Sequence, residues 1–147
     1  MDQNLHVACP ACNTTNRVAH GRLGEAPTCG HCKQPLLPPR PIELTSANFD
    51  RQVAVTDLPL VVDFWATWCG PCRMMAPGFE EAAARLSPHV RLGKLDTEAQ
   101  PEIAARFGIR SIPTLIAFRG GREVARQSGA MGAPQLLNWI QAHVTAK

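Results

Sequence analysis

Several features are scarce or absent in this chain, and each argues against a class of protein. No stretch approaches the roughly 18 consecutive apolar residues of a membrane-spanning helix. The start, MDQNLHVACP, has neither the basic cluster nor the apolar run of a secretory leader. The formal net charge of +3 is too small to indicate a nucleic-acid partner. We therefore expect a cytoplasmic protein that binds neither membrane nor nucleic acid.

Aromatic residues are missing from the first forty positions, which contain no Trp, Tyr or Phe. Bulky aliphatic residues are also few there, so this segment cannot bury enough apolar surface to fold unaided. Four of the seven residues from Pro35 to Pro41 are proline, a composition that favours an extended linker. We predict an N-terminal module over residues 1–34, a proline-rich linker over 35–41 and a larger domain over 42–147.

What the chain does have is six cysteines in three CxxC pairs: Cys9/Cys12, Cys29/Cys32 and Cys69/Cys72. Cytoplasmic thiols are kept reduced, so metal ligation or catalysis is favoured over a disulfide framework. The first two pairs are sixteen residues apart, within the spacing typical of four-cysteine zinc sites. Two tight turns, each carrying two thiolates, can complete a tetrahedron around zinc, and zinc binding can stabilise a module without a large core. We predict one structural Zn²⁺ bound by Cys9, Cys12, Cys29 and Cys32.

Two alternatives to this zinc site stay open. The four cysteines could be free thiols in a disordered tail, or one of the histidines could replace a cysteine as a ligand. His31 lies between Cys29 and Cys32 and could not bind zinc alongside both without strain. We therefore leave His6, His20 and His31 out of the predicted ligand set.

The larger domain alternates between strand and helix patterns. Strands are expected over 41–45, 58–66 and 90–97, followed by a hairpin turning at Gly120-Gly121. Helices are expected from a cap at Thr45 or Ser46 and over 69–86, 98–107 and 134–144. This order predicts a mixed sheet with helices on both faces. We interpret Met74 and Trp65 as packing residues.

The third cysteine pair has different surroundings from the other two. Cys69 follows a buried strand and opens the long helix, where free N–H groups and the helix dipole favour a thiolate. Such placement lowers the pKa of a cysteine from about 8.5 toward about 7. Cys72, one turn further on, can attack a mixed disulfide on Cys69 intramolecularly, and Pro71 stiffens the first turn. The pattern indicates a working dithiol.

An acidic residue interrupts the apolar run LVVDFW. A carboxylate at Asp63 is costly inside a buried strand unless it is paired or protonated, and burial should raise its pKa. The alternative is an aspartate at a strand end that faces water.

Several separated motifs occur together in order: VDFWATWCGPC, RMMAP, GKLD, GIRSIPT and SGA. Over roughly residues 41–144 they resemble the thioredoxin family, and the four-cysteine extension is similar to that of its zinc-binding second bacterial type. The resemblance implies an α/β thioredoxin fold, with a central mixed five-stranded sheet flanked by four helices and a small N-terminal zinc ribbon. It also implies a protein-disulfide reductase without an organic cofactor, recharged with NADPH through a flavin-containing thioredoxin reductase.

The resemblance also implies roles for individual residues. Cys69 corresponds to the attacking thiol and Cys72 to the resolving thiol, with Asp63 and its neighbour Lys94 assisting proton transfer. Substrate contacts are implied for Trp68, Gly70, Pro71, Ile112, Pro113 and Gly129, with a cis peptide bond before Pro113. Arg73 and Ser111 depart from common family residues, which bears on substrate preference.

Two other functions remain compatible with the sequence. The chain could be a zinc-ribbon interaction module on an inactive scaffold, although a scaffold needs neither Cys69 nor Cys72. It could also be a redox sensor in which oxidation of the zinc thiolates ejects the metal.

Overall fold

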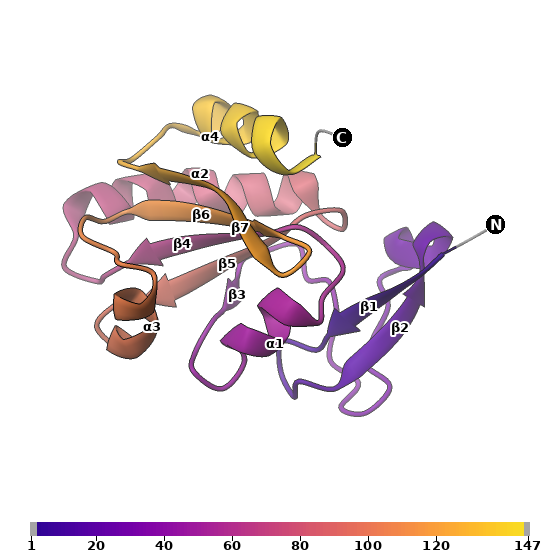
Figure 1. Ribbon diagram of the computed structural model, residues 1–147. Helices are drawn as coiled ribbons and strands as arrows, with labels where there is room; N and C mark the ends of the chain where they lie inside the picture. Colours follow the sequence, from indigo (N-terminus) through magenta and orange to yellow (C-terminus); the bar gives the residue numbers. More distant parts are fainter. Residues whose placement is uncertain (1–2, 146–147) are drawn as a thin grey trace.

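The computed structural model describes residues 3–145 and contains two sheets (Figure 1). The N-terminal part holds β1 (Asn4–Ala8), β2 (Thr15–Ala19) and the 3-10 helix η1 (His20–Glu25). The larger part holds β3 (Ile42–Glu43), α1 (Phe49–Ala54), β4 (Leu60–Trp65), α2 (Gly70–Leu86), β5 (Arg91–Asp96), α3 (Pro101–Arg106), β6 (Thr114–Arg119), β7 (Arg122–Ser128), α4 (Ala133–Ile140) and the π-helical turn η2 (Gln141–Thr145). Residues 1, 2, 146 and 147, the ends of the predicted module and domain, lie outside the described part.

The larger sheet has the strand order β3-β5-β4-β6-β7. β3, β5 and β4 run parallel, whereas β6 is antiparallel to β4 and β7 is antiparallel to β6. The predicted mixed five-stranded sheet with helices on both faces is thus confirmed.

Alternation along β4 divides the core into two layers. Val61 packs with Phe79 of α2 and Leu136 of α4 on one face of the sheet. Leu60, Val62 and Phe64 point to the other face, where the core includes residues of α1 and α3. By the same two-residue period, Asp63 shares the α2 face with Val61. This face matters because α2 carries the dithiol at its first turn.

The predicted hairpin turns at Gly120 and Gly121, whose φ angles of +60° and +80° suit the two central positions of a type I′ turn. The helix expected from residue 98 begins later, at Pro101. The Asp96 carboxylate accepts the backbone N–H groups of Glu98 (2.9 Å) and Ala99 (3.3 Å), which forms a separate turn before the helix.

The predicted cap of α1 at Thr45 or Ser46 is wrong, because the helix begins at Phe49. The Thr45 hydroxyl accepts the Ala47 N–H at 3.1 Å, and the side chain of Asn48 accepts the Thr45 N–H at 2.8 Å. These bonds hold a turn that precedes the helix. The polar side chains therefore stabilise a turn in place of an extra helical turn.

The interpretation of Met74 as a packing residue is also wrong, because its side chain is 81% exposed. Its neighbour Met75 is 2% exposed and lies in the core beneath α2. Trp65 is half-buried and packs beside the dithiol.

The N-terminal module, residues 3–34, docks on α1 and the turn that follows it. The His6 carbonyl accepts the Asp57 N–H (2.8 Å), and the Asp57 carboxylate accepts the His6 N–H (2.7 Å). The Thr56 hydroxyl accepts the Ala8 N–H at 3.1 Å. Leu58 completes the small apolar core of the module. Docking on the larger domain thus supplies burial that the module cannot provide from its own residues.

The proline-rich segment contributes to the same core. Leu36 is 1% exposed and packs with the module, and its N–H donates to the Pro27 carbonyl at 3.0 Å. A short antiparallel bridge pairs Thr28 with Pro35. This segment is therefore attached to the module at its start.

The two adjacent methionines of α2 provide a matched test of the core. We expect Met75→Ala to lower the free energy of unfolding by about 2–5 kcal/mol, because it leaves a cavity between α2 and the sheet. Met74→Ala should change it by less than about 0.5 kcal/mol, because that side chain is largely in solvent. Urea unfolding of both variants measures the difference, and equal losses would contradict the assignment of the inward face.

Candidate active site and metal centre

The dithiol lies at the junction of β4 and α2. Cys69 is the N-cap of α2, and its sulfur accepts the backbone N–H of Cys72 at 3.2 Å. Pro71 occupies the first turn, where its missing N–H costs no helical hydrogen bond. Cys69 and Cys72 form a disulfide, with their Cα atoms 5.3 Å apart. The two cysteines can therefore form a disulfide, and the N-terminus of α2 offers a hydrogen-bond donor to the Cys69 sulfur.

The segment before β6 lies against this disulfide. The peptide bond between Ile112 and Pro113 is cis, and the Ile112 carbonyl oxygen is 3.8 Å from the Cys69 sulfur. The Pro113 carbonyl accepts the N–H of Gly129, which has a φ angle of +101°. The fold thus brings Ile112, Pro113 and Gly129, which are distant in sequence from the cysteines, to the dithiol.

The surface around the dithiol is partly apolar. Trp68 is 65% exposed, and both Gly70 and Pro71 are exposed. The cysteines themselves are nearly covered, at 3% for Cys69 and 2% for Cys72. Access to the disulfide is therefore limited to a small opening bordered by exposed residues.

Asp63 is buried on the α2 face of β4, with an exposure of 1%. Neither of its carboxylate oxygens has a hydrogen-bond partner among the described residues. Burial raises the pKa of Asp63 to about 7, and the charge of Lys94 lowers it in partial opposition. The carboxyl group can therefore gain or lose a proton near neutral pH.

Lys94 lies opposite Asp63 in the pairing of β4 with β5. Its ammonium group is 4.2 Å from the centre of the Trp65 ring, a cation–π distance. Lys94 thus acts on Asp63 through its charge, without a hydrogen bond to the carboxylate.

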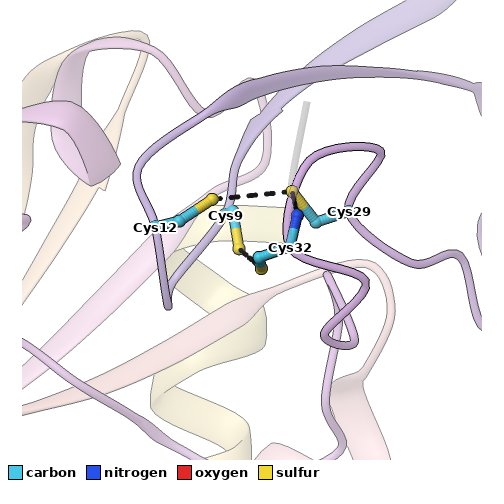
Figure 2. A group of neighbouring side chains, drawn as sticks. All are labelled: Cys9, Cys12, Cys29 and Cys32. Carbon is cyan, nitrogen blue, oxygen red and sulfur yellow. Dashed lines mark hydrogen bonds between the residues drawn. The ribbon is translucent and has the colours of Figure 1, made fainter.

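The four remaining cysteines converge from two loops of the N-terminal module (Figure 2). Their sulfur atoms all lie within 4.8 Å of one another. The Cys9 and Cys32 sulfurs are 3.6 Å apart, and the Cys12 and Cys29 sulfurs are 3.7 Å apart. Zn–S bonds of about 2.3 Å in a tetrahedron require sulfur atoms about 3.8 Å apart. The cluster therefore fits a zinc ion.

The two loops have the same backbone pattern. The N–H of Asn13 donates to the Cys9 carbonyl (2.9 Å), and the N–H of Lys33 donates to the Cys29 carbonyl (3.0 Å). Asn13 and Lys33 have left-handed φ angles of 68° and 69°. This repeated turn explains how two CxxC pairs present their sulfurs to one point.

Hydrogen bonds favour the thiolate at one position of the cluster, and burial favours the thiol at another. The Cys32 N–H, followed by Asn16 and the His31 N–H, lowers the pKa of Cys29 to about 5. Burial raises the pKa of Cys9 to about 12. A bound divalent cation would offset the cost of ionising the buried Cys9 thiol, because metal ligation deprotonates a thiol.

Two family models match the chain. The model described as Thioredoxin matches residues 40–142, and the model described as Thioredoxin 2, N-terminal matches residues 8–34. The chain belongs to the thioredoxin family. It is accordingly a thiol-disulfide oxidoreductase of the protein-disulfide reductase class, with a zinc-ribbon-like N-terminal module.

Individual relatives agree with this assignment. Thioredoxin C-3 of Corynebacterium nephridii is 46% identical over 134 residues, which cover 91% of this chain and 92% of that protein. Thioredoxin of Alicyclobacillus acidocaldarius is 52% identical over 93 residues, which cover 63% of this chain and 88% of that protein. A bifunctional thioredoxin reductase/thioredoxin of Mycobacterium leprae is 48% identical over 96 residues, covering 65% of this chain and 21% of that protein. No helix within residues 3–145 has the length and apolar character to cross a membrane.

Reasoning from the sequence missed two residues near the metal centre of this thioredoxin-family chain. Asn16 donates to the Cys29 sulfur at 3.4 Å and accepts the Gly30 N–H at 2.9 Å. No local pattern marks this asparagine. Arg91 lies buried at the start of β5, where a cation in an apolar strand is a detectable signal.

The raised pKa of Asp63 predicts a dependence of stability on pH. Unfolding returns the pKa from about 7 to 3.8, so between these values the folded state holds a proton that the unfolded state lacks. The free energy of unfolding should therefore fall as pH rises from about 4 to about 7, by about 4 kcal/mol at most. Asp63→Asn should remove this contribution, so its stability relative to wild type should be greater at pH 8 than at pH 4.5. Urea unfolding of both oxidised proteins at the two pH values measures this difference, and a constant difference would contradict the buried-acid assignment.

Proposed function

We propose that this chain reduces disulfide bonds in other proteins through its Cys69–Cys72 dithiol. The observation that carries the proposal is the position of the pair at the first turn of α2, where the Cys72 N–H donates to the Cys69 sulfur. A hydrogen bond and a helix N-terminus both stabilise a thiolate, which is the nucleophile in disulfide exchange. Cys69 is therefore the attacking residue in this proposal.

The reaction takes place in two exchanges. The Cys69 thiolate attacks one sulfur of a substrate disulfide, the substrate S–S bond breaks, and the first substrate thiolate leaves. Cys72 then gives up its proton and attacks the Cys69 sulfur, which releases the second substrate thiolate and forms the Cys69–Cys72 disulfide. Two electrons pass from the dithiol to the substrate. The proximity of the two cysteines makes the second exchange intramolecular and fast.

Asp63 is the proposed acceptor of the Cys72 proton. This role is supported by the position of Asp63 on the α2 face of β4 and by its burial. Its pKa of about 7 also supports the role, because a base with such a pKa exchanges protons readily at neutral pH. Lys94 tunes the carboxyl through its charge. In the reverse direction, the same carboxyl group returns a proton to the Cys72 thiolate.

The substrates in this proposal are protein segments that carry a disulfide. Exposed Trp68, with Gly70 and Pro71, offers a contact surface beside the sulfur. The backbone around Ile112, Pro113 and Gly129 borders the same opening and can align an extended chain.

An NADPH-dependent thioredoxin reductase is the proposed electron source, and the cytoplasm is the proposed compartment. Support for the reductase comes from the relative in Mycobacterium leprae, which is named a bifunctional thioredoxin reductase/thioredoxin. The four unbridged cysteines of the module suit a reducing compartment.

The N-terminal module is proposed to hold one zinc ion as a structural element. It docks at the start of β5 and on α1, whereas the dithiol follows the other end of β4 (Figure 1). The six residues of β4 separate the two sites by about 20 Å. A redox-regulatory role for zinc release would have to act across this length of sheet.

The reduced protein should contain one zinc per chain, and a zinc-free preparation under reducing conditions would contradict the proposal.

Trapping variants distinguish the roles of the two active-site cysteines. Cys72→Ser should accumulate a covalent mixed disulfide with a substrate such as insulin, because the first exchange proceeds and the second cannot. Cys69→Ser should form no such species, and both variants should lose insulin reduction in the presence of reductase and NADPH. Mass spectrometry of the products measures trapping, and zinc content serves as the folding control. Trapping by Cys69→Ser at the level of Cys72→Ser would contradict the assigned order of attack.

A further inference from the structure

Arg91 is a buried cation at the boundary between the sheet and the N-terminal module. It is 5% exposed and is the first residue of β5. Its guanidinium donates to the Ala8 carbonyl at 3.1 Å, to the Gln52 side-chain oxygen at 2.7 Å and to the Leu36 carbonyl. All three acceptors are neutral. A charge removed from water in this way is costly unless an anion lies close by.

No carboxylate within the described residues fills that role. Glu25 pairs with Arg22, and Asp57 pairs with His6, both at the surface. The salt bridges of residues 3–145 do not include Arg91. Within residues 3–145, therefore, no aspartate or glutamate side chain forms an ion pair with the guanidinium.

The four-cysteine cluster is the candidate for the compensating anion, because one of its members adjoins a residue that Arg91 contacts. Ala8, whose carbonyl accepts from Arg91, directly precedes Cys9, and both residues are 0% exposed. Burial lowers the pKa of Arg91 to about 10, while the charge of Cys9 raises it, so the two groups interact electrostatically. A divalent zinc ion with four thiolates carries a net charge of about −2.

We propose that Arg91, a residue of the thioredoxin domain, supplies the positive charge that balances the zinc–tetrathiolate centre and so raises its affinity for zinc. This inference rests on the proposed zinc site. It makes Arg91 a positioning and charge-balancing residue that acts through the backbone of Ala8, not a ligand. Residues around the ligands of a metal commonly change its affinity by about 10–100-fold.

Arg51 provides a matched control on the same boundary. Its guanidinium also donates to a backbone carbonyl beside a ligand, that of Asn13 after Cys12, at 3.0 Å, and to the Thr15 hydroxyl. Arg51 is exposed, so water screens its charge. Loss of Arg51 removes hydrogen bonds to the module without removing a buried charge.

The test uses the full-length protein and measures zinc affinity by competition with a chromophoric chelator at neutral pH under reducing conditions. Arg91→Gln keeps a hydrogen-bond donor without the charge, and Arg91→Lys keeps the charge without the planar fork. We expect Arg91→Gln to weaken zinc binding about 10–100-fold. Arg91→Lys should lose markedly less, and Arg51→Gln should stay within about twofold of wild type. Circular dichroism confirms that each variant is folded.

A second arm varies the charge of the cluster itself. Cys32→His replaces one thiolate by a neutral imidazole and changes the net charge of the loaded centre from about −2 to about −1. A smaller negative charge on the loaded centre weakens its Coulomb interaction with the guanidinium, so the ratio of the zinc affinities with Arg91 and with Arg91→Gln should be smaller in this background. Cys32 is the chosen position because its side chain is only half-buried.

Each outcome has a definite meaning. Two results would overturn the charge-balancing role and leave Arg91 as a hydrogen-bond donor only. The first is an equal ratio of zinc affinities in the Cys32 and Cys32→His backgrounds. The second is an equal loss of zinc affinity in Arg91→Gln and Arg91→Lys. Those results would leave the zinc site itself in place. A wild-type protein without measurable zinc affinity would instead overturn the proposed zinc site and this inference together.

Discussion

The junction between β4 and α2 is the constraint on which the chemistry depends. The strand ends at Trp65, and Cys69 caps the helix that crosses the same face of the sheet. Because β6 pairs with β4, the cis Ile112–Pro113 bond just before β6 reaches the disulfide. Because Asp63 is two residues from Val61 along β4, the two side chains share a face of the sheet, and the Asp63 carboxyl is buried on the α2 side. The proposed nucleophile, substrate surface and proton acceptor are therefore all positioned by the pairing of two strands and the start of one helix.

A second centre occupies the opposite end of the same strands. Leu58 completes the small core of the N-terminal module. The Thr56 hydroxyl accepts the Ala8 N–H, and the side chains of Gln52 and Arg91 donate to the Ala8 carbonyl. β5 contributes Arg91 at this end and Lys94 beside Asp63. The same strand thus connects the surroundings of the four-cysteine cluster with those of Asp63. The module stabilises itself by contact with the sheet and leaves the opening around Trp68 uncovered.

Local patterns in the sequence were sufficient to predict much of this fold. The apolar run around Asp63, the two glycines at the hairpin and the spacing of the CxxC pairs depend on neighbouring residues, and the strands, the turn and the four-sulfur cluster agree with them. Features set by distant contacts were missed. Which of the two adjacent methionines faces the core depends on how α2 packs, and the structure has Met75 in the core and Met74 exposed. Two of the acceptors of Arg91 lie 55 and 83 residues away. The helix expected from Thr45 starts later because the side chains of Thr45 and Asn48 hold the preceding residues in a separate turn.

The most direct test of the account is the pH dependence of alkylation of the reduced protein, followed at each cysteine by mass spectrometry. If the start of α2 stabilises a thiolate, Cys69 should react before Cys72, with a half-maximal rate near pH 7. A midpoint near pH 8.5, as for an ordinary cysteine, or faster reaction at Cys72, would contradict it.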